Sequence, residues 1–396
     1  MKDQKRRQLR GRAEPSDEIW PFLRALVSPG AESLERWLSG NAFGRVLPVC
    51  EANRVAPYVF YRLRHENLLS HEPGEVNAAL RLAYDTAAAQ HLLYRWELAE
   101  LLNELRPWGV QPILLKGMAL GATLYPTPAT RPVSDIDLLI RREDVPAFRE
   151  VVGGRGYRDT GLDPEHRVGF PNHLATSRTL PGGNEVHVEA HWALVHELSR
   201  APRMGFDDLN PRAQEIDMGG FAVRVLDPAD QLIHACAHLS LHHVWNWDLL
   251  WLLDLRLLVD RYGSTWNWSD VVSRARGLDL VGSIGECLEL AEYWYGRFLP
   301  DPARQALAAG AASHGEPRSI GLGSSGSPLI WQLVWARVRE ERNWVRRLAY
   351  FRDNLFPPWS YMQYRYGARS RWLAPVYYGW RLVRGAAAAF THLGSG

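Results

Sequence analysis

The sequence predicts an α+β fold, in which a small mixed α/β module lies between two helical regions. Two observations lead to this prediction. Apolar residues recur at helical spacing over residues 18–106 and again from Pro228 onward, whereas residues 107–227 contain short apolar runs bounded by Gly, Pro and Asn. Because apolar spacing follows the repeat of the backbone, these changes divide the chain into three regions.

Composition limits the classes of protein that the chain can belong to. The 396 residues are 46% hydrophobic and 23% charged with a net charge of +2, as in globular proteins of two or three domains. We therefore expect no stable nucleic-acid complex. No apolar run approaches about 18 residues, so we expect no membrane span. The cysteines Cys50, Cys236 and Cys287 have no paired spacing, which predicts reduced thiols in a cytoplasmic protein.

The N-terminal region is predicted to be helical after a charged tail. Residues 1–17 are basic and lack the apolar segment of a secretory signal, so we expect a disordered tail. Residues 18–106 are predicted to form helices. The clearest pattern is "AAAQHLLYRWELAELLNELRPWG", which ends at Pro107 and Gly109.

Residues 107–227 are predicted to form the α/β core. The run "VQPILLKG" reads as a buried strand that enters a tight turn at Gly117, followed by a short helix in "MALGATLY" and a loop in "TPATRP". A second strand is predicted in "DIDLLI" and a helix in "REDVPAFREVVGGRGY". Further strands are predicted in "HLATSRTL", "NEVHVEAHWAL" and "FAVRVLD".

The C-terminal region, residues 228–396, is predicted to be helical, with a Gly/Ser-rich loop near 309–328. Its first helix carries His234, His238 and His242 at i, i+4 and i+8, along one stripe. Three interpretations stay open for this stripe: structural or substrate-contacting histidines, a metal site, and an acid–base role. Asp254, on the next helix, could hold one of these histidines in a single tautomer.

Two aspartates on one strand are the first candidate for chemistry. Asp135 and Asp137 are two residues apart, so on a strand they share one face, and their repulsion is relieved in water or by a cation between them. Magnesium prefers such oxygen ligands. An exposed strand end or a helix cap is the alternative. A later predicted strand also carries four ionisable side chains on one face: Glu185, His187, Glu189 and His191.

One lysine is the second candidate. Apart from Lys2 and Lys5 in the tail, Lys116 is the only lysine of a chain that otherwise uses arginine. It stands between an apolar run and Gly117, where a strand turns and exposes backbone N–H groups that can hold phosphate oxygens. An ammonium adds a compact positive charge with rotatable donors. Chance is the alternative explanation for its position.

These motifs resemble the polymerase-β-like nucleotidyltransferases. The similarity is greatest to the family described as uncharacterised nucleotidyltransferases, in "LLKGMALGATLY", "RPVSDIDLLI" and "VEAHW". It also covers the histidine-rich helix and the helix of Asp254, and spans roughly residues 90–390. The resemblance implies a polymerase-β-like core, a mixed sheet with helices, flanked by helical N- and C-terminal regions. The chain departs from the wider superfamily at Met118, where serine is common.

The resemblance also implies roles for individual residues. By this match, the metal-binding catalytic carboxylates are Asp135, Asp137 and Glu189, because Glu189 precedes "HW". The nucleotide phosphates are expected at Lys116, Gly117 and Arg131. Two Mg²⁺ or Mn²⁺ ions are expected. Four histidines are candidates for substrate contact: His187, His191, His238 and His242.

The function implied by the resemblance is transfer of a nucleoside monophosphate from an NTP to an unidentified acceptor, with release of pyrophosphate. The acceptor would be a small molecule, a peptide or a protein. Two alternatives stay open: a catalytically inactive nucleotide-binding or scaffold protein of the same fold, and a nucleic-acid-modifying or toxin-like nucleotidyltransferase. The low net charge argues against the nucleic-acid alternative.

Overall fold

The structure is a computed structural model of the chain. It describes residues 19–28, 34–35, 42–69, 74–160, 173–194, 204–242 and 248–312, and residues 356, 372, 375 and 377–379. The predicted tail, residues 1–17, lies outside these ranges. Most of the Gly/Ser-rich loop predicted near 309–328, and most of the helical region predicted after it, also lie outside them.

A seven-stranded mixed sheet forms the α/β core, with the spatial order β3-β4-β5-β2-β1-β7-β6. The strands are β1 (Ile113–Leu114), β2 (Ile136–Leu139), β3 (Arg158–Asp159), β4 (His173–Thr179), β5 (Glu185–His191), β6 (Gln214–Asp217) and β7 (Ala222–Val225). Strand β2 runs antiparallel to β1 and parallel to β5, and β1 runs parallel to β7. The predicted α+β class with a mixed sheet is confirmed.

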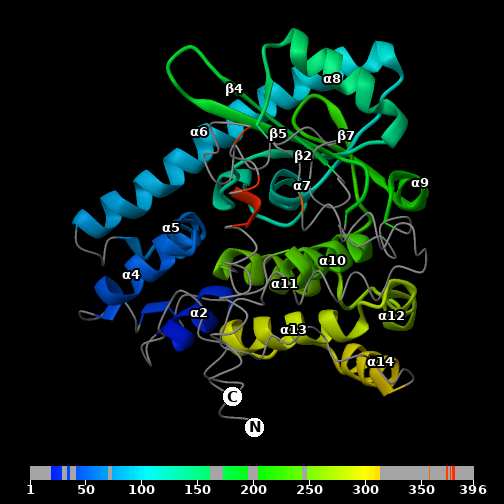
Figure 1. The fold of residues 1–396 in the computed structure, drawn as a ribbon. Helices are drawn as coiled ribbons and strands as arrows, with labels where there is room; N and C mark the ends of the chain where they lie inside the picture. Colours follow the sequence, from blue (N-terminus) through cyan, green and yellow to red (C-terminus); the bar gives the residue numbers. More distant parts are fainter. Residues whose placement is uncertain are drawn as a thin grey trace.

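Helices surround this sheet and continue into a separate layer (Figure 1). They are α2 (Ile19–Val27), α4 (Ala42–Ala52), α5 (Ala56–His65), α6 (Gly74–Leu105), α7 (Lys116–Thr123), α8 (Val145–Gly154), α9 (Phe206–Leu209), α10 (Pro228–Ala237), α11 (Leu249–Tyr262), α12 (Trp268–Arg276), α13 (Val281–Tyr295) and α14 (Asp301–Ala312). None of the helices in the described ranges is long and apolar enough to cross a bilayer.

Apolar burial joins regions that are distant in the sequence. The C-terminal half of α6 packs on the sheet through Tyr94, Leu98 and Leu101, which share a buried cluster with strands β1, β2 and β5. Helices α2 and α5 instead share a second cluster with α10, α11 and α13. Trp20 of α2, for example, lies 5.7 Å from Trp294 of α13 between ring centroids. The N-terminal helices therefore support both the sheet and the helical layer.

Side-chain caps set where the helices beside the sheet begin. Asp227 accepts a hydrogen bond from the backbone N–H of Ala229 at 3.1 Å, and Pro228 occupies the first turn of α10, where its missing N–H is not needed. Asp248 caps α11 by accepting from the N–H of Trp251 at 3.1 Å. After α10 the chain continues as a π-helical turn over His238–His242.

Glu97 joins α6 to the edge of the sheet through a buried polar network. Its side chain is fully buried and accepts hydrogen bonds from Arg155 at 2.7 Å, Arg178 at 2.7 Å and the Tyr157 hydroxyl at 2.8 Å. Two arginines thus share one buried carboxylate. Buried charges of this kind stabilise a fold only while the partners remain together.

Glu97→Gln is expected to lower the free energy of unfolding by about 3–5 kcal/mol, because it leaves two guanidinium groups around a neutral amide. Urea unfolding followed by circular dichroism measures this change. Asp85→Asn is the matched control, since Asp85 forms an exposed pair with Arg81 on the same helix and should change stability by less than about 0.5 kcal/mol. Equal losses in the two variants would contradict the role given to Glu97.

Candidate functional site

A cavity of about 440 Å³ lies where the sheet meets the helical layer. On the sheet side it is lined by residues of β2, β5 and the start of α7, and on the helical side by residues of α10 and α11. The polar side chains on the sheet side include Lys116, Asp135, Asp137, Glu189 and His191. The sequence motifs from three separate segments therefore meet at one place.

The register of β2 and β5 places two carboxylates side by side. Asp137 pairs with Glu189 across these parallel strands, so both side chains lie on the same face of the sheet. Asp137 is 1% exposed, whereas the side chain of Glu189 remains 28% exposed. Glu185, four residues earlier on β5, is exposed and accepts a hydrogen bond from Ser177 at 2.6 Å. Glu189, not Glu185, is therefore the carboxylate beside Asp137.

Lys116 and His191 neutralise this carboxylate pair. The Lys116 ammonium donates to Asp137 Oδ1 at 2.6 Å and lies 4.0 Å from Glu189 Oε2. His191 Nε2 lies 2.8 Å from Asp137 Oδ1 and 3.3 Å from Glu189 Oε2. Since a carboxylate only accepts, Nε2 carries the hydrogen. Burial alone would raise the pKa of Asp137, but the Lys116 charge and the His191 hydrogen bond outweigh it, and the pKa is lowered.

One carboxylate oxygen of Asp137 has a different environment from the other. Within the described part of the chain, Asp137 Oδ2 is buried and has no hydrogen-bond partner. Oxygen and nitrogen atoms of Asp137, Glu189 and His191 all lie within 4.8 Å of one another, close enough to share a single cation. The two carboxylates are the oxygen ligands that Mg²⁺ and Mn²⁺ prefer, and the His191 imidazole could join them only after Nε2 has lost its hydrogen.

Asp135 lies at the same cavity but outside this trio. It precedes β2, is half-buried, and accepts a hydrogen bond from Ser134 Oγ at 3.2 Å. Burial, followed by repulsion from Asp137, raises its pKa to about 7. The predicted metal set of Asp135, Asp137 and Glu189 thus lines one cavity, while His191, predicted as a substrate contact, is the third member of the tightest group.

The turn before α7 differs from the prediction in one respect. The residue with left-handed backbone is Lys116, with φ of +46°, and not Gly117, which lies in the first turn of the helix. Residues other than glycine rarely adopt this backbone conformation, and strain of this kind is found at functional sites. Gly117 is needed for a different reason, because a Cβ there would lie 2.8 Å from Nη1 of Arg131. The glycine allows close packing, and the lysine forms the turn.

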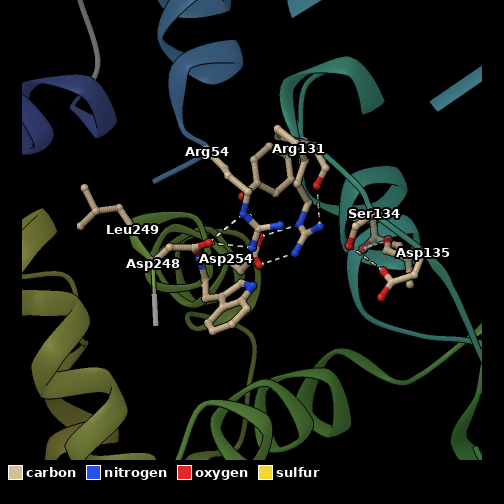
Figure 2. A network of polar contacts seen from close by, with 12 residues as sticks. Arg54, Arg131, Ser134, Asp135, Asp248, Leu249 and Asp254 are labelled. Atoms are coloured by element: carbon tan, nitrogen blue, oxygen red, sulfur yellow. Dashed lines mark hydrogen bonds and ion pairs between the residues drawn. The ribbon is translucent and has the colours of Figure 1, made fainter. Parts of the chain in front are cut away.

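Arg131 forms an ion pair with Asp254 of the helical layer (Figure 2). Its Nε and Nη2 donate to the two oxygens of Asp254 at 2.9 and 2.7 Å, and the Tyr125 hydroxyl donates to the same carboxylate at 2.7 Å. Both residues of the ion pair are almost fully buried. Burial would lower the pKa of Arg131, but Asp254 raises it. The guanidinium therefore binds a carboxylate in this structure, and its contact with the nucleotide phosphates stays a prediction.

The ion pair also positions the loop that leads to Asp135. The Arg131 carbonyl accepts from His91 Nε2 of α6 at 3.0 Å, and the Ser134 carbonyl accepts from the Tyr94 hydroxyl at 2.6 Å. Burial lowers the pKa of His91 to about 4, so its ring is neutral, and because a carbonyl only accepts, Nε2 is the nitrogen that carries the hydrogen. Asp254 therefore acts on the loop through Arg131. The sequence had led us to expect that it would orient a histidine, and among the described residues it does not.

The predicted histidines have different positions. His234 and His238 both line the cavity, with ring centroids 6.2 Å apart. His242 ends the π-helical turn, and its side chain lies outside the described part. His187 has a side chain 44% exposed, lies 3.8 Å from Glu185, and is not among the residues that line the cavity. The described members of the stripe form no metal cluster of three ligands.

The cavity lining includes residues that were not among the predicted site residues, such as Arg54, His173, Gln231 and Trp251. The His173 ring stacks on His191 at 5.1 Å between centroids. The Arg54 guanidinium pairs with Asp248 at 2.6 Å and lies 5.6 Å from the Trp251 ring centre. Arg54 has a left-handed φ of +60°, which no motif in the sequence indicates.

Comparison with known proteins identifies the family of the chain. A family model matches residues 39–296, well over half of the chain, and assigns it to the nucleotidyltransferases. The chain belongs to the family described as uncharacterised nucleotidyltransferases. No curated protein matches the sequence.

Among solved structures, the chain is similar to an antigenic nucleotidyltransferase-like protein from Paracoccidioides brasiliensis. The two share 12% identity, with a TM-score of 0.32, over 48% of this chain and 91% of that one. A likeness of this degree carries no argument about function.

Proposed function

We propose that the protein is a metal-dependent nucleotidyltransferase, which moves a nucleoside monophosphate from an NTP to an acceptor in the cytoplasm and releases pyrophosphate. One observation carries the proposal. Asp137 and Glu189 face each other across β2 and β5 at the wall of a cavity, and Asp137 Oδ2 is buried without a hydrogen-bond partner in the described residues. Membership of a nucleotidyltransferase family supports the same reaction.

The carboxylates fit the role of cation ligands. Asp137 and Glu189 would hold one ion, and Asp135, on the same cavity, would contribute to a second. Bound divalent ions would neutralise the charge that develops on the triphosphate. A bond forms between the acceptor nucleophile and the α-phosphorus, and the bond from that phosphorus to pyrophosphate breaks. The bound cation would lower the pKa of the acceptor nucleophile, whose proton passes to solvent at the cavity.

The Lys116 ammonium has two binding partners in this proposal: a carboxylate and the nucleotide phosphates. In the present structure its ammonium neutralises Asp137, and with cations on the carboxylates it turns toward the phosphates of the nucleotide. Lys116 has a left-handed backbone at the start of α7, and its side chain contacts Asp137 from there. An ammonium suits this exchange because it is a compact charge on a flexible chain.

Lys116→Arg is expected to preserve the fold and to weaken NTP binding about tenfold, because a planar, forked guanidinium does not fit between Asp137 and the phosphates. Titration calorimetry with NTP, in the presence and absence of Mg²⁺, measures this change. Arg158→Lys, on the exposed strand β3, is a control that should bind NTP like the parent. Parental NTP affinity in Lys116→Arg would remove the lysine from the phosphate site.

Transfer itself is tested with labelled nucleotide. The protein is incubated with each NTP labelled at the α-phosphate, with Mg²⁺ or Mn²⁺ and an extract of small molecules and proteins, and the labelled product is identified. Label in a small molecule, peptide or protein is expected, and its absence with EDTA. Label in nucleic acid would favour the nucleic-acid-modifying alternative. NTP binding without transfer under any of these conditions would favour an inactive nucleotide-binding protein.

A further inference from the structure

The helical wall of the cavity carries two buried polar side chains that the proposed reaction does not use. Gln231 and His234 lie three residues apart on α10, on one face of the helix, and both line the cavity. Gln231 is 6% exposed and His234 is 4% exposed. They face the same space as Asp137 and Glu189 but belong to a different layer of the fold.

Gln231 presents a hydrogen-bond acceptor without a donor. Its Nε2 donates to the Leu226 carbonyl at 2.8 Å, and this bond fixes which end of the amide is oxygen. Its Oε1 is buried and has no hydrogen-bond partner among the residues that the structure describes. A buried carbonyl of this kind is costly to leave unpaired, so a donor from a bound molecule would satisfy it.

His234 presents a neutral imidazole. Its contact with His238 is an edge-to-face ring contact, and within the described ranges it forms no hydrogen bond or ion pair. Burial, assisted by the nearby charges of Lys116 and His191, lowers the pKa of His234 to about 3. The ring is therefore uncharged at neutral pH and has one nitrogen that accepts a hydrogen bond and one that donates.

We infer that Gln231 and His234 form the binding wall for the acceptor, and that the acceptor is an uncharged molecule whose hydroxyl groups donate hydrogen bonds to this wall. The inference rests on the proposed function for the transfer step and adds the chemical class of the second substrate. The wall and the carboxylates line the same cavity from two layers of the fold, so a molecule held by the wall would present a hydroxyl group to the space where the proposed reaction places the nucleotide.

Charge at the cavity distinguishes a neutral acceptor from charged ones. An anionic group on the wall would meet Gln231 Oε1, which only accepts hydrogen bonds, and would share the cavity with Asp135, Asp137 and Glu189. A cationic group beside His234 would meet Lys116 and His191, whose charges outweigh the opposing charge of Asp137 at this ring. A hydroxyl group donates one hydrogen bond and accepts others without a net charge, which suits both side chains.

The test is direct binding of three matched sets of small ring polyols: unmodified, phosphorylated and aminated. Saturation-transfer NMR measures binding to the full chain in the presence of Mg²⁺ and a non-hydrolysable NTP analogue. We expect saturable binding of members of the unmodified set, at least tenfold tighter than their charged counterparts. Tighter binding of the phosphorylated or aminated set, or no binding of the unmodified set, would overturn the inference.

Two variants locate the binding on this wall. Gln231→Met and His234→Phe remove the polar atoms and keep similar shapes, so each should weaken polyol binding about tenfold. Ser240→Ala is the control, because Ser240 bonds to the Cys236 carbonyl and does not line the cavity. Thermal unfolding identifies a variant that fails to fold, and polyol binding by the other variant then tests the inference. Unchanged polyol binding in a folded variant contradicts the inference.

NTP binding separates this inference from the proposed function. Both variants should bind the NTP analogue within about twofold of the parent, since neither residue is placed at the phosphates. Parental NTP binding combined with lost polyol binding supports the wall. If the parent binds polyols but neither NTP nor metal, the proposed nucleotidyl transfer fails while the binding wall stands. If a folded variant loses NTP binding as much as polyol binding, the wall is not specific to the acceptor, and the inference fails.

Discussion

Asp137→Asn is expected to reduce nucleotidyl transfer by about a thousandfold or more. The substitution keeps the shape of the side chain but removes the charge that faces Glu189, Lys116 and His191. A neutral amide is a poor ligand for Mg²⁺, and loss of a correctly held cation costs on the order of 4 kcal/mol of transition-state stabilisation. Label transfer from α-labelled NTP, measured at saturating Mg²⁺, gives the size of the effect.

The matched control for this prediction is Glu185→Gln. Glu185 lies on the same strand as Glu189, but it is exposed and bonds to Ser177. The Glu185→Gln variant should therefore transfer label at the parental rate. Equal losses in Glu185→Gln and Asp137→Asn would mean that transfer reports the folding of the sheet and not a cation held by Asp137. Parental transfer by a folded Asp137→Asn would place the catalytic cation elsewhere.

Asp254→Asn is expected to lower the free energy of unfolding by about 3–5 kcal/mol, because it leaves the Arg131 guanidinium buried without an anionic partner. Urea unfolding measures this change. Folded protein should also transfer label more slowly, since Arg131 holds both the loop to Asp135 and the packing against Gly117. Asp301→Asn is the control, because Asp301 and Arg297 form an exposed pair whose loss should cost less than about 0.5 kcal/mol.

A double variant separates burial from charge. Replacing both members of the pair, Arg131→Leu with Asp254→Leu, should recover a large part of the stability that Asp254→Asn loses, because no buried charge is left unpaired. It should not recover transfer, since the contacts that position the loop are still absent. Recovery of both stability and transfer would show that the ion pair has no positioning role.

The short-range features of the fold could be predicted from sequence because local patterns carry them. The apolar runs of β1 and β2, the alternation of β5 and the first turn of α10 each follow from residues close together in the chain. Strands β3 and β6 were not predicted, because β3 is exposed along its whole length and β6 along most of it, so neither shows apolar alternation. They are held by pairing with β4 and β7.

The site was predicted in part for the same reason. Spacing alone placed Asp135 and Asp137 together, and the motif before "HW" indicated Glu189. The partners of Arg131 and His191 depend on contacts between segments distant in the sequence, which periodicity does not report. Asp254 lies 123 residues after Arg131, and Asp137 lies 54 residues before His191. The π-helical turn after α10 likewise changes the spacing on which the predicted histidine stripe depended.

Binding of Mn²⁺, followed by electron paramagnetic resonance in the presence of a non-hydrolysable NTP analogue, tests the central claim most directly. The claim is that Asp137 and Glu189 hold a divalent cation at the nucleotide. The parent should bind two ions saturably, with Mg²⁺ in competition, and folded Asp137→Asn should lose at least one of them. Parental Mn²⁺ binding in Asp137→Asn, or no saturable binding in the parent, would contradict the claim.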